Sequence, residues 1–594
     1  DLDPGGNDKQ NWAAINSVAA NGSDELVYDI DTTTLANGSY TVDFYASTGL
    51  EEGQVEGRRY VGTAVGVSSG AGTLSSTLVG STVAANEYIT LVTTDAGGNS
   101  SEFSAYSAIT PVTIIVDTTS DASDGDTSDI TSLLGDRGDD GFISLREAIE
   151  AANNTANGTT PDQIHFNIAG TGPHTITPSG TLPNIIDAVI IDGTSEPDFA
   201  GAPVIELDGS GAGAGANGLA FSGGGAGSTV RGFAINQFAN SGIFLSNVNN
   251  VTITGNYIGT NIAGTADQGN TVSGIVLSNA DVNTIGGLTA AERNVISGNN
   301  SHGIDLQNGS ASNNITGNYI GTNALGTAPI GNGNWGIALS SGSNNNTIGG
   351  ALASARNIIS GNTVGIDFTD ASTSDNSVQG NYIGLNAAGS SSIGNSNAAI
   401  VVQNSAAANT IESNVIAGGS TDGIRINGAD NTQILSNFIG TNAAGDADLG
   451  FLQEGVEVSN ADGTIIGAVG QGNLISGNNS AGIGLRAAAS NTKIVANLIG
   501  TNAANDAAIA NSVHGIAISS TASGSVIGGV SAGEGNTIRF NVGDGVNITG
   551  SGTGHSVVGN SIFTNTDLGI DLDVDGVTNN DFNDIDGGVN NLQN

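Results

Sequence analysis

The hexapeptide Asn-Tyr-Ile-Gly-Thr-Asn occupies residues 256–261 and returns at residues 318–323. Related hexapeptides begin at Asn381 (NYIGLN), Asn437 (NFIGTN), Asn497 (NLIGTN) and Asn560 (NSIFTN). By subtraction, successive copies begin 62, 63, 56, 60 and 63 residues apart. A regular period of this kind is typical of stacked supersecondary units, so the sequence predicts a solenoid.

A shorter repeat, Gly-Ile-x-Leu, recurs within the long one at spacings of 24 to 34 residues, for example from Gly274, Gly303 and Gly336. Each short unit also contains two further apolar segments bounded by Gly, Asn and Ser, which is typical of brief strands. Alternation places Ile and Leu on one face of the strand and x on the other. Three short strands per turn predict a right-handed parallel β-helix, with coils stacked about 4.8 Å apart.

The asparagines of the hexapeptide have a predicted structural role. Those at its start and end are expected to fall in register from coil to coil. A buried amide there donates to the Asn above and accepts from the Asn below, as in stacked cross-β structure.

Residues 12–111 lack the coil motif. Segment 39–46 alternates cleanly, with Tyr40, Val42 and Phe44 on one face, and further strands follow between turns. The spacing predicts an immunoglobulin-like β-sandwich. The segment TTDAGGNSSEFS (93–104) resembles the last hairpin of bacterial immunoglobulin-like repeat domains, although a generic Gly-Asn turn is the alternative.

An acidic segment, 112–141, is predicted to be a linker and contains eight aspartates, among them Asp124, Asp126 and Asp129. It is interpreted either as a solvated loop or as a linker ordered by Ca²⁺, which prefers oxygen ligands. Residues 142–160 then supply the one predicted α-helix, with Ser144 as N-cap and Glu147 completing a capping box. An amphipathic helix there is expected to cap the exposed edge of the first coil.

The segment FISLREAIEAANN (142–154) resembles the CSLREA box that precedes β-helical repeats in large secreted bacterial proteins, with Ile143 where that family has Cys. Together with the sandwich hairpin and the coil motifs, it makes the chain similar to a repeat unit of giant secreted or surface bacterial proteins. The resemblance implies an extracellular or cell-surface location and an adhesin or fibre protein.

Charge and composition narrow the possible partners. The formal net charge is −44, from 56 acidic residues against 12 Lys plus Arg. This balance excludes nucleic acid as a plausible partner and favours divalent cations. There is no Cys and no long apolar run, so neither disulfides nor membrane insertion are expected.

The x residues of the short repeat include a few acidic and basic side chains. Asp305 and Asp367 fall two coils apart, about 10 Å, a separation that suits an inverting glycosidase. No other acidic or basic residue joins them at neighbouring coils. Arg425 and Glu457 are expected to form a surface ion pair that adds little to stability. The five histidines share no column. The sequence therefore predicts no catalytic site and a chain that is not an enzyme.

The best ligand pattern is Asp571, Asp573 and Asp575 followed by Gly576, which matches the first half of a Ca²⁺ loop. Phe582 stands where a bidentate Glu is expected, and neighbouring acids would have to substitute for it. A solvated acidic tail is the alternative. The predicted Ca²⁺ ligands are Asp571, Asp573, Asp575, Asp584, Asp586, Asp124, Asp126 and Asp129.

The two ends of the chain resemble each other. Residues 1–11 and 584–594 agree at six of eleven positions, which predicts a period of 583 residues. Residues 1–11 are accordingly interpreted as the tail of a preceding unit, residues 161–594 as the β-helix, and the partner as neighbouring units joined end to end.

The all-β reading leads to a functional prediction. A non-enzymatic structural or adhesive module of an extracellular bacterial surface protein or fibre is expected, with surface polysaccharide as a further partner. The alternative is a carbohydrate-active β-helix enzyme or a polysaccharide-binding module.

Overall fold

The computed structural model of the protein describes residues 13–21, 25–33, 35, 38–47, 59–68, 73–79, 88–108, 113–157, 160–573, 576–577 and 590. The structure is nearly all β in these ranges, and both α-helices that they contain are short. No helix among them has the length and apolar character needed to cross a membrane. The chain divides into two compact units: residues 1–171, 183–197 and 223–229 form the first, and the remainder forms the second.

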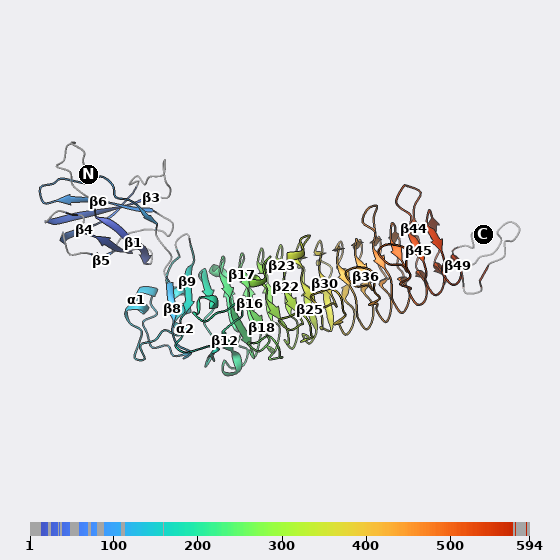
Figure 1. The fold of residues 1–594 in the computed structure, drawn as a ribbon, viewed down its shortest axis with the longest axis horizontal. Coiled ribbons are helices and arrows are strands. Elements are labelled where there is room, and N and C mark those ends of the chain that lie inside the picture. The colour runs from blue at the N-terminus through green and yellow to red at the C-terminus, as the bar shows by residue number, and fades with distance from the viewer. Residues whose placement is uncertain are drawn as a thin grey trace. The chain divides into compact units, whose positions relative to one another are not determined.

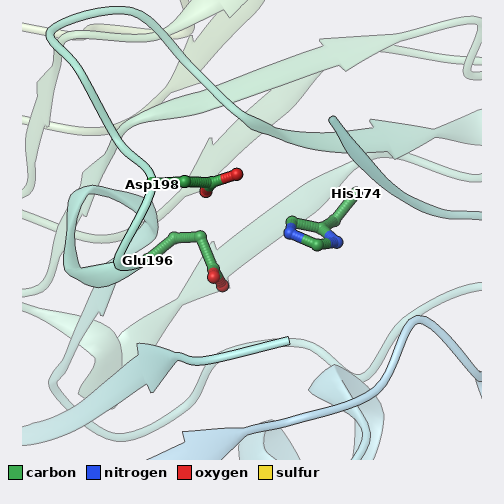
Figure 2. A group of neighbouring side chains, drawn as sticks. All are labelled: His174, Glu196 and Asp198. Atoms are coloured by element: carbon green, nitrogen blue, oxygen red, sulfur yellow. The ribbon is translucent and has the colours of Figure 1, made fainter. Parts of the chain in front are cut away.

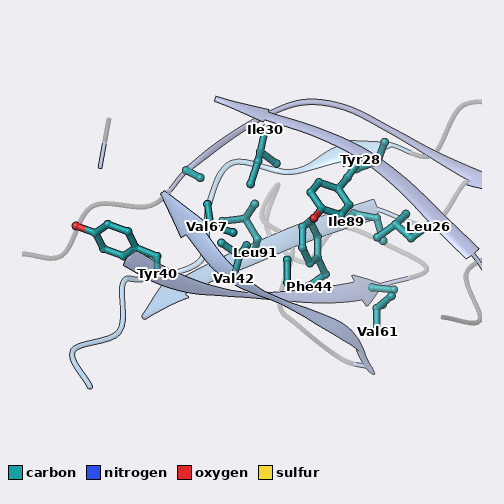
Figure 3. Packing of buried hydrophobic residues seen from close by; sticks show 14 of the residues in the cluster. Leu26, Tyr28, Ile30, Tyr40, Val42, Phe44, Val61, Val67, Ile89 and Leu91 are labelled. Carbon is teal, nitrogen blue, oxygen red and sulfur yellow. The ribbon is translucent and has the colours of Figure 1, made fainter. Parts of the chain in front are cut away.

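The first unit begins with two antiparallel sheets whose inner faces share one apolar core. One sheet has the order β1-β2-β5 and the other β4-β3-β6-β7. Buried side chains of both sheets meet in the core, and the rings of Tyr28 and Phe44 lie 4.7 Å apart (Figure 3). Tyr40, Val42 and Phe44 are buried as the alternation predicts. The strands are β1 (Ala14–Asn21), β2 (Glu25–Asp31), β3 (Ser39–Ser47), β4 (Arg59–Ser68), β5 (Thr73–Val79), β6 (Tyr88–Asp95) and β7 (Ser107–Ala108).

The first unit also contains parallel strands and both helices. Strands β8 (Thr113–Val116) and β11 (Val189–Asp192) each pair in parallel with β9 (Asp162–Phe166). Helix α2 (Leu145–Asn154) has Ser144 as N-cap and the predicted capping box with Glu147. The segment predicted to be a linker contains β8 and a helix that was not predicted, α1 (Ile130–Gly135). That helix is only six residues long; it has a local cap at Asp129 and buries Ile130 and Leu133.

The second unit is a parallel β-helix built from three long sheets, along which the strands progress in chain order (Figure 1). In this unit the first sheet contains β17 (Thr252–Thr254), β20 (Thr284–Gly286), β23 (Asn314–Thr316), β26 (Thr347–Gly349), β29 (Ser377–Gln379), β32 (Thr410–Glu412), β35 (Gln433–Leu435), β38 (Ile465–Ile466), β41 (Lys493–Ile494), β44 (Val526–Gly528) and β47 (Ser556–Val558). Strand β14 (Thr229–Arg231) has residues in both units.

The second sheet contains β10 (His174–Ile176), β12 (Ile205–Asp208), β15 (Phe233–Asn236), β18 (Tyr257–Ile258), β21 (Val295–Ile296), β24 (Tyr319–Ile320), β27 (Ile358–Ile359), β30 (Tyr382–Ile383), β33 (Val415–Ile416), β36 (Phe438–Ile439), β39 (Leu474–Ile475), β42 (Leu498–Ile499), β45 (Thr537–Arg539) and β48 (Ser561–Phe563).

The third sheet is formed by the Gly-Ile-x-Leu strands. It contains β13 (Leu219–Ser222), β16 (Ile243–Ser246), β19 (Ile275–Ser278), β22 (Ile304–Gln307), β25 (Trp335–Leu339), β28 (Val364–Phe368), β31 (Ile400–Gln403), β34 (Ile424–Asn427), β37 (Val456–Ser459), β40 (Ile483–Arg486), β43 (Ile516–Ile518), β46 (Val546–Ile548) and β49 (Ile570–Leu572). The Ile and Leu of these strands point into the buried core of the coil, for example Ile304 and Leu306, except in the last strand, where Ile570 is exposed.

The first asparagine of each hexapeptide forms the predicted ladder. The Asn318 amide donates to Asn357 Oδ1 at 3.1 Å and accepts from the Asn294 amide at 2.9 Å. The same pattern continues from Asn256 to Asn560, and Asn318 is fully buried. Each buried amide is thus satisfied by its neighbours above and below.

The last asparagine of the first five hexapeptides does not form a ladder, contrary to expectation, whereas in the sixth copy Asn565 Oδ1 accepts from the Asn541 amide at 2.9 Å. Asn261 Oδ1 accepts from the backbone of Thr265 and Ala266 and so closes a short loop. This loop stacks on its equivalent two coils later, with Ala324 N donating to Gly264 O at 2.9 Å. Because only alternate coils carry the loop, the long period is twice the short one.

These loops lie over the outer side of the second sheet. Tyr257, Tyr319 and Tyr382 pack there with Ala324 and Ala387 of the loops in a small apolar cluster. The outer side of the second sheet is therefore used for packing.

Candidate active site

Two rows of side chains run along the outer face of the third sheet. One row is the x residue of each strand, and the other is the residue immediately before the glycine. Contacts between the rows place them on one face: Arg425 of the x row donates to Asp422 at 2.6 Å, and Asn547 donates to Asp544 at 3.1 Å. The outer face therefore carries more titratable side chains than the x row alone.

The most perturbed titratable groups gather on this face. Among the described residues, the groups with the largest pKa displacements are His302, Asp305, Asp367 and Asp422, and all four belong to the two rows. Perturbed pKa values cluster at functional sites because catalysis needs groups that titrate near the working pH. We therefore take this face as the candidate active site.

Asp305 and Asp367 form the central acid pair. Asp305 on β22 and Asp367 on β28 are both in register with Ala338 of the intervening β25. Two strand spacings place their Cα atoms about 10 Å apart. The side chain between the two acids is thus only a methyl group, that of Ala338.

Asp367 is held by one hydrogen bond and has one free oxygen. Gln403 Nε2 donates to Asp367 Oδ1 at 2.9 Å. Asp367 is only 1% exposed, and its Oδ2 has no partner among the described residues. Burying an unpaired charged oxygen is costly, so the protonated form is favoured.

The two acids titrate at different pH values. Burial raises the pKa of Asp367 to about 7; the Gln403 hydrogen bond opposes this rise and the nearby Asp370 adds to it. Burial alone raises the pKa of Asp305 to about 6. Near neutral pH, Asp367 retains much of its proton while Asp305 is mostly ionised. Two carboxyl groups separated in this way are suited to acid and base roles.

An aromatic platform lies beside the acid pair. The rings of His302 and Trp335 stack with centroids 4.7 Å apart and an interplanar angle of 23°. Trp335, on the same strand as Ala338, packs against an apolar patch of Val364, Ala398 and Val401. Burial lowers the pKa of His302 to about 4, so the imidazole is neutral at neutral pH.

A charged network continues the face toward the C-terminus. Carboxylate oxygens of Asp422, Glu454 and Glu457 all lie within 4.8 Å of one another. Arg425 contacts Asp422 at 2.6 Å and Glu457 at 3.9 Å, which confirms the predicted Arg425–Glu457 pair, and Arg486 contacts Glu454. Burial raises the pKa of Asp422 to about 6, against the lowering effect of Arg425. Three carboxylates thus share two arginines, with Arg425 serving both Asp422 and Glu457.

A pocket of about 590 Å³ lies further along the same face, lined among others by His514, Asp544, Asn547 and Asp571. The backbone N of Asp544 donates to His514 Nδ1 at 3.0 Å, and the Asp544 carboxylate lies 3.3 Å from the same nitrogen.

The structure places the predicted Ca²⁺ ligands in separate surroundings. In the first unit, Asp124 Oδ2 accepts from the backbone of residues 139 and 140, Asp126 Oδ1 accepts from Ser128 N, and Asp129 caps α1. In the second unit, Asp571 lies on β49 and Asp573 follows it with a positive φ of 79°. The ligands Asp575, Asp584 and Asp586 fall outside the described residues, as do both chain ends predicted to join neighbouring units. Calcium binding and end-to-end assembly stay predictions.

Figure 2 shows His174, Glu196 and Asp198, none of which was predicted as a site residue. In the second unit, Asp198 Oδ2 accepts from Gly172 N at 2.6 Å, and His174 lies on β10. In the first unit, Glu196 Oε2 accepts from Ile168 N at 3.0 Å. Each carboxylate therefore holds backbone of its own unit in place.

Sequence reasoning missed the second row because it considered only x as outward. Trp335, Asp422, Glu454 and Asp544 each precede the glycine of the tetrad. His302 and His514 do so as well, so the expectation that the histidines share no column is wrong. The signal was present, since the same position relative to the glycine carries these residues in six coils.

No family model matches the chain, and neither does any curated protein. Among solved structures, the chain is similar to the A-module of a mannuronan C-5 epimerase of Azotobacter vinelandii, at 13% identity over 73% of this chain and 95% of that one, with a TM-score of 0.36. It is also similar to the Dettilon tailspike protein (14% identity, 77% and 68% covered, TM-score 0.35). A third similar structure is the catalytic domain of an alpha-1,3-glucanase (13%, 93% and 90%, TM-score 0.29). These similarities show the fold alone, a right-handed parallel β-helix.

The prediction of a non-enzymatic structural or adhesive module is contradicted. Two of these three structures are those of enzymes, a mannuronan epimerase and a glucanase. The prediction also depended on an outer face without converging groups. The row before the glycine adds His302 and Trp335 beside Asp305 and Asp367 and supplies what the x row lacked.

Proposed function

We propose that the chain is an enzyme that hydrolyses a glycosidic bond of a polysaccharide on the outer face of the third sheet. The observation that carries this proposal is the acid pair across Ala338, with pKa values raised to about 6 for Asp305 and about 7 for Asp367. A glycosidase needs one carboxyl group that keeps its proton and a second that has lost it.

Asp367 is assigned the role of general acid. Its buried Oδ2 has no partner in the described residues and holds the proton near neutral pH. Because Asp367 is 1% exposed, its side chain must first turn outward to reach the substrate. The proton then passes to the glycosidic oxygen while the bond from that oxygen to the anomeric carbon breaks. The Gln403 hydrogen bond to Oδ1 stabilises the carboxylate that results.

Asp305 is assigned the role of general base. It takes a proton from a water molecule as the water oxygen bonds to the anomeric carbon from the opposite face of the sugar. The products are a leaving hydroxyl and a hemiacetal, and solvent restores the two carboxyl groups to their starting states. Room for a water between base and sugar requires carboxyl groups about 6.5–9.5 Å apart. Two strand spacings place the Cα atoms about 10 Å apart, so the two side chains have to lean slightly toward each other to meet that range. The product should therefore have inverted anomeric configuration.

The test is release of reducing ends from a panel of polysaccharides by the purified chain. Asp305→Asn and Asp367→Asn should each lower the rate at least about 100-fold, the usual contribution of a general acid or base. Asp446→Asn is the matched control. Asp446 is exposed in a loop, and the Asn442 amide that donates to its carboxylate can donate equally well to the side-chain oxygen of an Asn. Unchanged rates in both acid variants, or a product that retains its configuration, would overturn the assignment.

Three finer parts of the sequence reading are also proposed. The N-terminal sandwich is of the bacterial immunoglobulin-like type, and α2 is a CSLREA-type cap. The intact capping box of Ser144 and Glu147 supports the second of these. A location outside the cell suits an enzyme that acts on a polysaccharide.

A further inference from the structure

We infer that the outer face of the sandwich sheet β4-β3-β6-β7 is a polysaccharide-binding site, on which sugar rings stack against Tyr60 and Phe103. The site belongs to the first unit, whereas the acid pair belongs to the second. The inference goes beyond the proposed hydrolysis, and it rests on the proposed function only for the class of ligand.

Five aromatic rings gather on this face, and three of them are well exposed. Tyr60, Phe103 and Tyr106 expose 56%, 41% and 42% of their surface. The ring centroid of Tyr45 lies 5.8 Å from that of Tyr60 and 5.3 Å from that of Phe103, and those of Tyr88 and Tyr106 lie 5.2 Å apart. These five residues form the sandwich patch.

The pairing of the strands places the sandwich patch at one end of the sheet. Tyr45 alternates with the buried Phe44, so it points to the outer side. Tyr60 pairs with Tyr45, and Tyr88 pairs with Ser47, two residues further along β3. Exposed apolar groups that gather in this way mark interaction sites, whereas single ones need no explanation.

The ring of Tyr60 lies along its own strand. Tyr45 pairs with Tyr60 and Asp43 with Thr63, although Tyr60 and Thr63 are three residues apart, so β4 has a bulge between them. The Tyr60 hydroxyl bonds to Thr63 Oγ1, which in turn donates to Asp43 Oδ1. Because its tip is held at Thr63, the ring lies over the strand, with one face toward the sheet and the other toward solvent.

The neighbouring ring touches Tyr60 and Phe103 without stacking on them. Tyr45 lies against both rings at interplanar angles of 70° and 85°, so the contacts are edge-to-face. These are the ring contacts of Tyr60 and Phe103 among the described residues. Together with the exposed fractions, they leave ring surface of both residues open to a ligand.

The patch combines the two properties that bind a sugar. A pyranose has an apolar C–H face and a rim of hydroxyl groups. The open ring of Tyr60 suits the C–H face, while the Thr63 hydroxyl and the Asp43 carboxylate at its tip offer hydrogen bonds to the rim. The hydrogen bond to Thr63 already fixes the ring, so binding costs little conformational entropy.

A second copy of the chain is the competing occupant, because aromatic rings also form protein interfaces. Asp43 argues against it. A protein surface that covered Tyr60 would also remove the neighbouring Asp43 carboxylate from water, which is costly unless other donors replace the water. The cores of protein interfaces are depleted in charged residues for this reason. A glycan instead brings many hydroxyl donors.

The test is affinity electrophoresis of the full chain in native gels that contain hydroxyethyl cellulose, galactomannan or alginate. Asp367→Asn is the background, so that the polysaccharide in the gel is not cut. We expect retardation in at least one gel. Tyr60→Ala and Phe103→Ala should each weaken that binding about tenfold, and Tyr60→Phe should keep most of it because the ring remains. Phe142→Ala, which removes a ring that is 48% exposed outside the sandwich patch, is the matched control and should change nothing.

Retardation that both alanine variants lose supports the inference. Equal retardation of the parent and these variants, or none in any of the gels, overturns it. A dimer in sedimentation that the alanine variants abolish also overturns it, because the face then binds a second copy.

The proposed hydrolysis is judged separately, from the reducing ends released by the chain with Asp367 intact. Ring-dependent retardation without such release supports the inference and overturns the hydrolysis. Release without ring-dependent retardation supports the hydrolysis and overturns the inference.

Discussion

Replacing Asp367 by Asn should make the protein more stable above neutral pH while removing its activity. The variant keeps the shape of the side chain and an oxygen that accepts from Gln403. In the folded protein, burial raises the pKa of Asp367 from 3.8 to about 7. Between these pH values the folded state binds a proton that the unfolded chain does not bind. The stability of the parent protein therefore falls as the pH rises through this range.

The expected magnitude follows from the two pKa values. They differ by about three, and each whole step corresponds to about 1.4 kcal/mol, so ionising Asp367 costs the folded state about 4 kcal/mol above pH 7. No discount for solvent screening is needed because the side chain is 1% exposed. Asn has no charge to bury. The variant should equal the parent near pH 4 and exceed it by up to about 4 kcal/mol at pH 8.

The measurement is urea unfolding at pH 4, 6 and 8, followed by Trp335 emission in a Trp12→Phe background. Midpoints are comparable provided the slopes of the transitions agree. Asp305→Asn should show a smaller gain, because the pKa of Asp305 is raised only to about 6. Asp446→Asn, an exposed control, should show none. A gap between Asp367→Asn and the parent that fails to widen from pH 4 to pH 8 would refute the reasoning.

Four other predictions follow from the same contacts. The rate of hydrolysis should peak between about pH 6 and 7, falling on the acid side as Asp305 is protonated and on the alkaline side as Asp367 loses its proton; a rate still rising at pH 9 would contradict this. Asn318→Ala should lower the urea-unfolding free energy by about 3–5 kcal/mol, since it leaves buried ladder partners unsatisfied. Glu147→Ala should cost about 3 kcal/mol and speed hydrogen exchange in α2, because the buried carboxylate caps three backbone amides. Chelation of calcium should lower the melting temperature if the acidic segments 124–129 and 571–586 bind it, and identical melting curves would remove that prediction.

The coil itself was predictable because its causes are local and repeated. Ile304 and Leu306 alternate around one outward residue, and the same pattern returns in every coil. The first Asn of the hexapeptide was also predictable, since a buried amide in a stacked array finds its equivalent above and below. Helix α2 followed from the short-range capping box at Ser144. Each of these features depends on neighbours in sequence or on exact repetition.

The remaining features depend on how the corners of the coil turn. Asn261 was expected to join a ladder, but its side chain closes the loop that follows it. Strand alternation does not fix the direction of the residue before the tetrad glycine, because in most coils that residue lies outside the strand, Trp335 on β25 being an exception. The pairing of Asp422 with Arg425 became visible only in three dimensions. The acid pair was recognised from its spacing, but the burial that raises both pKa values was not.

The second and third sheets use their outer faces differently, which explains why the titratable and aromatic side chains gather on the third. The outer side of the second sheet is occupied by loops that pack on Tyr257 and Tyr319. On the third sheet each coil instead presents two outward positions, the x residue and the residue before the glycine. Changing them leaves the inward Ile and Leu and the asparagine ladders intact, so polar and aromatic residues can be introduced coil by coil without disturbing the core. Because neighbouring coils are only about 4.8 Å apart, such residues also bury one another, and that mutual burial is what moves the pKa of Asp367 to a value useful for proton transfer.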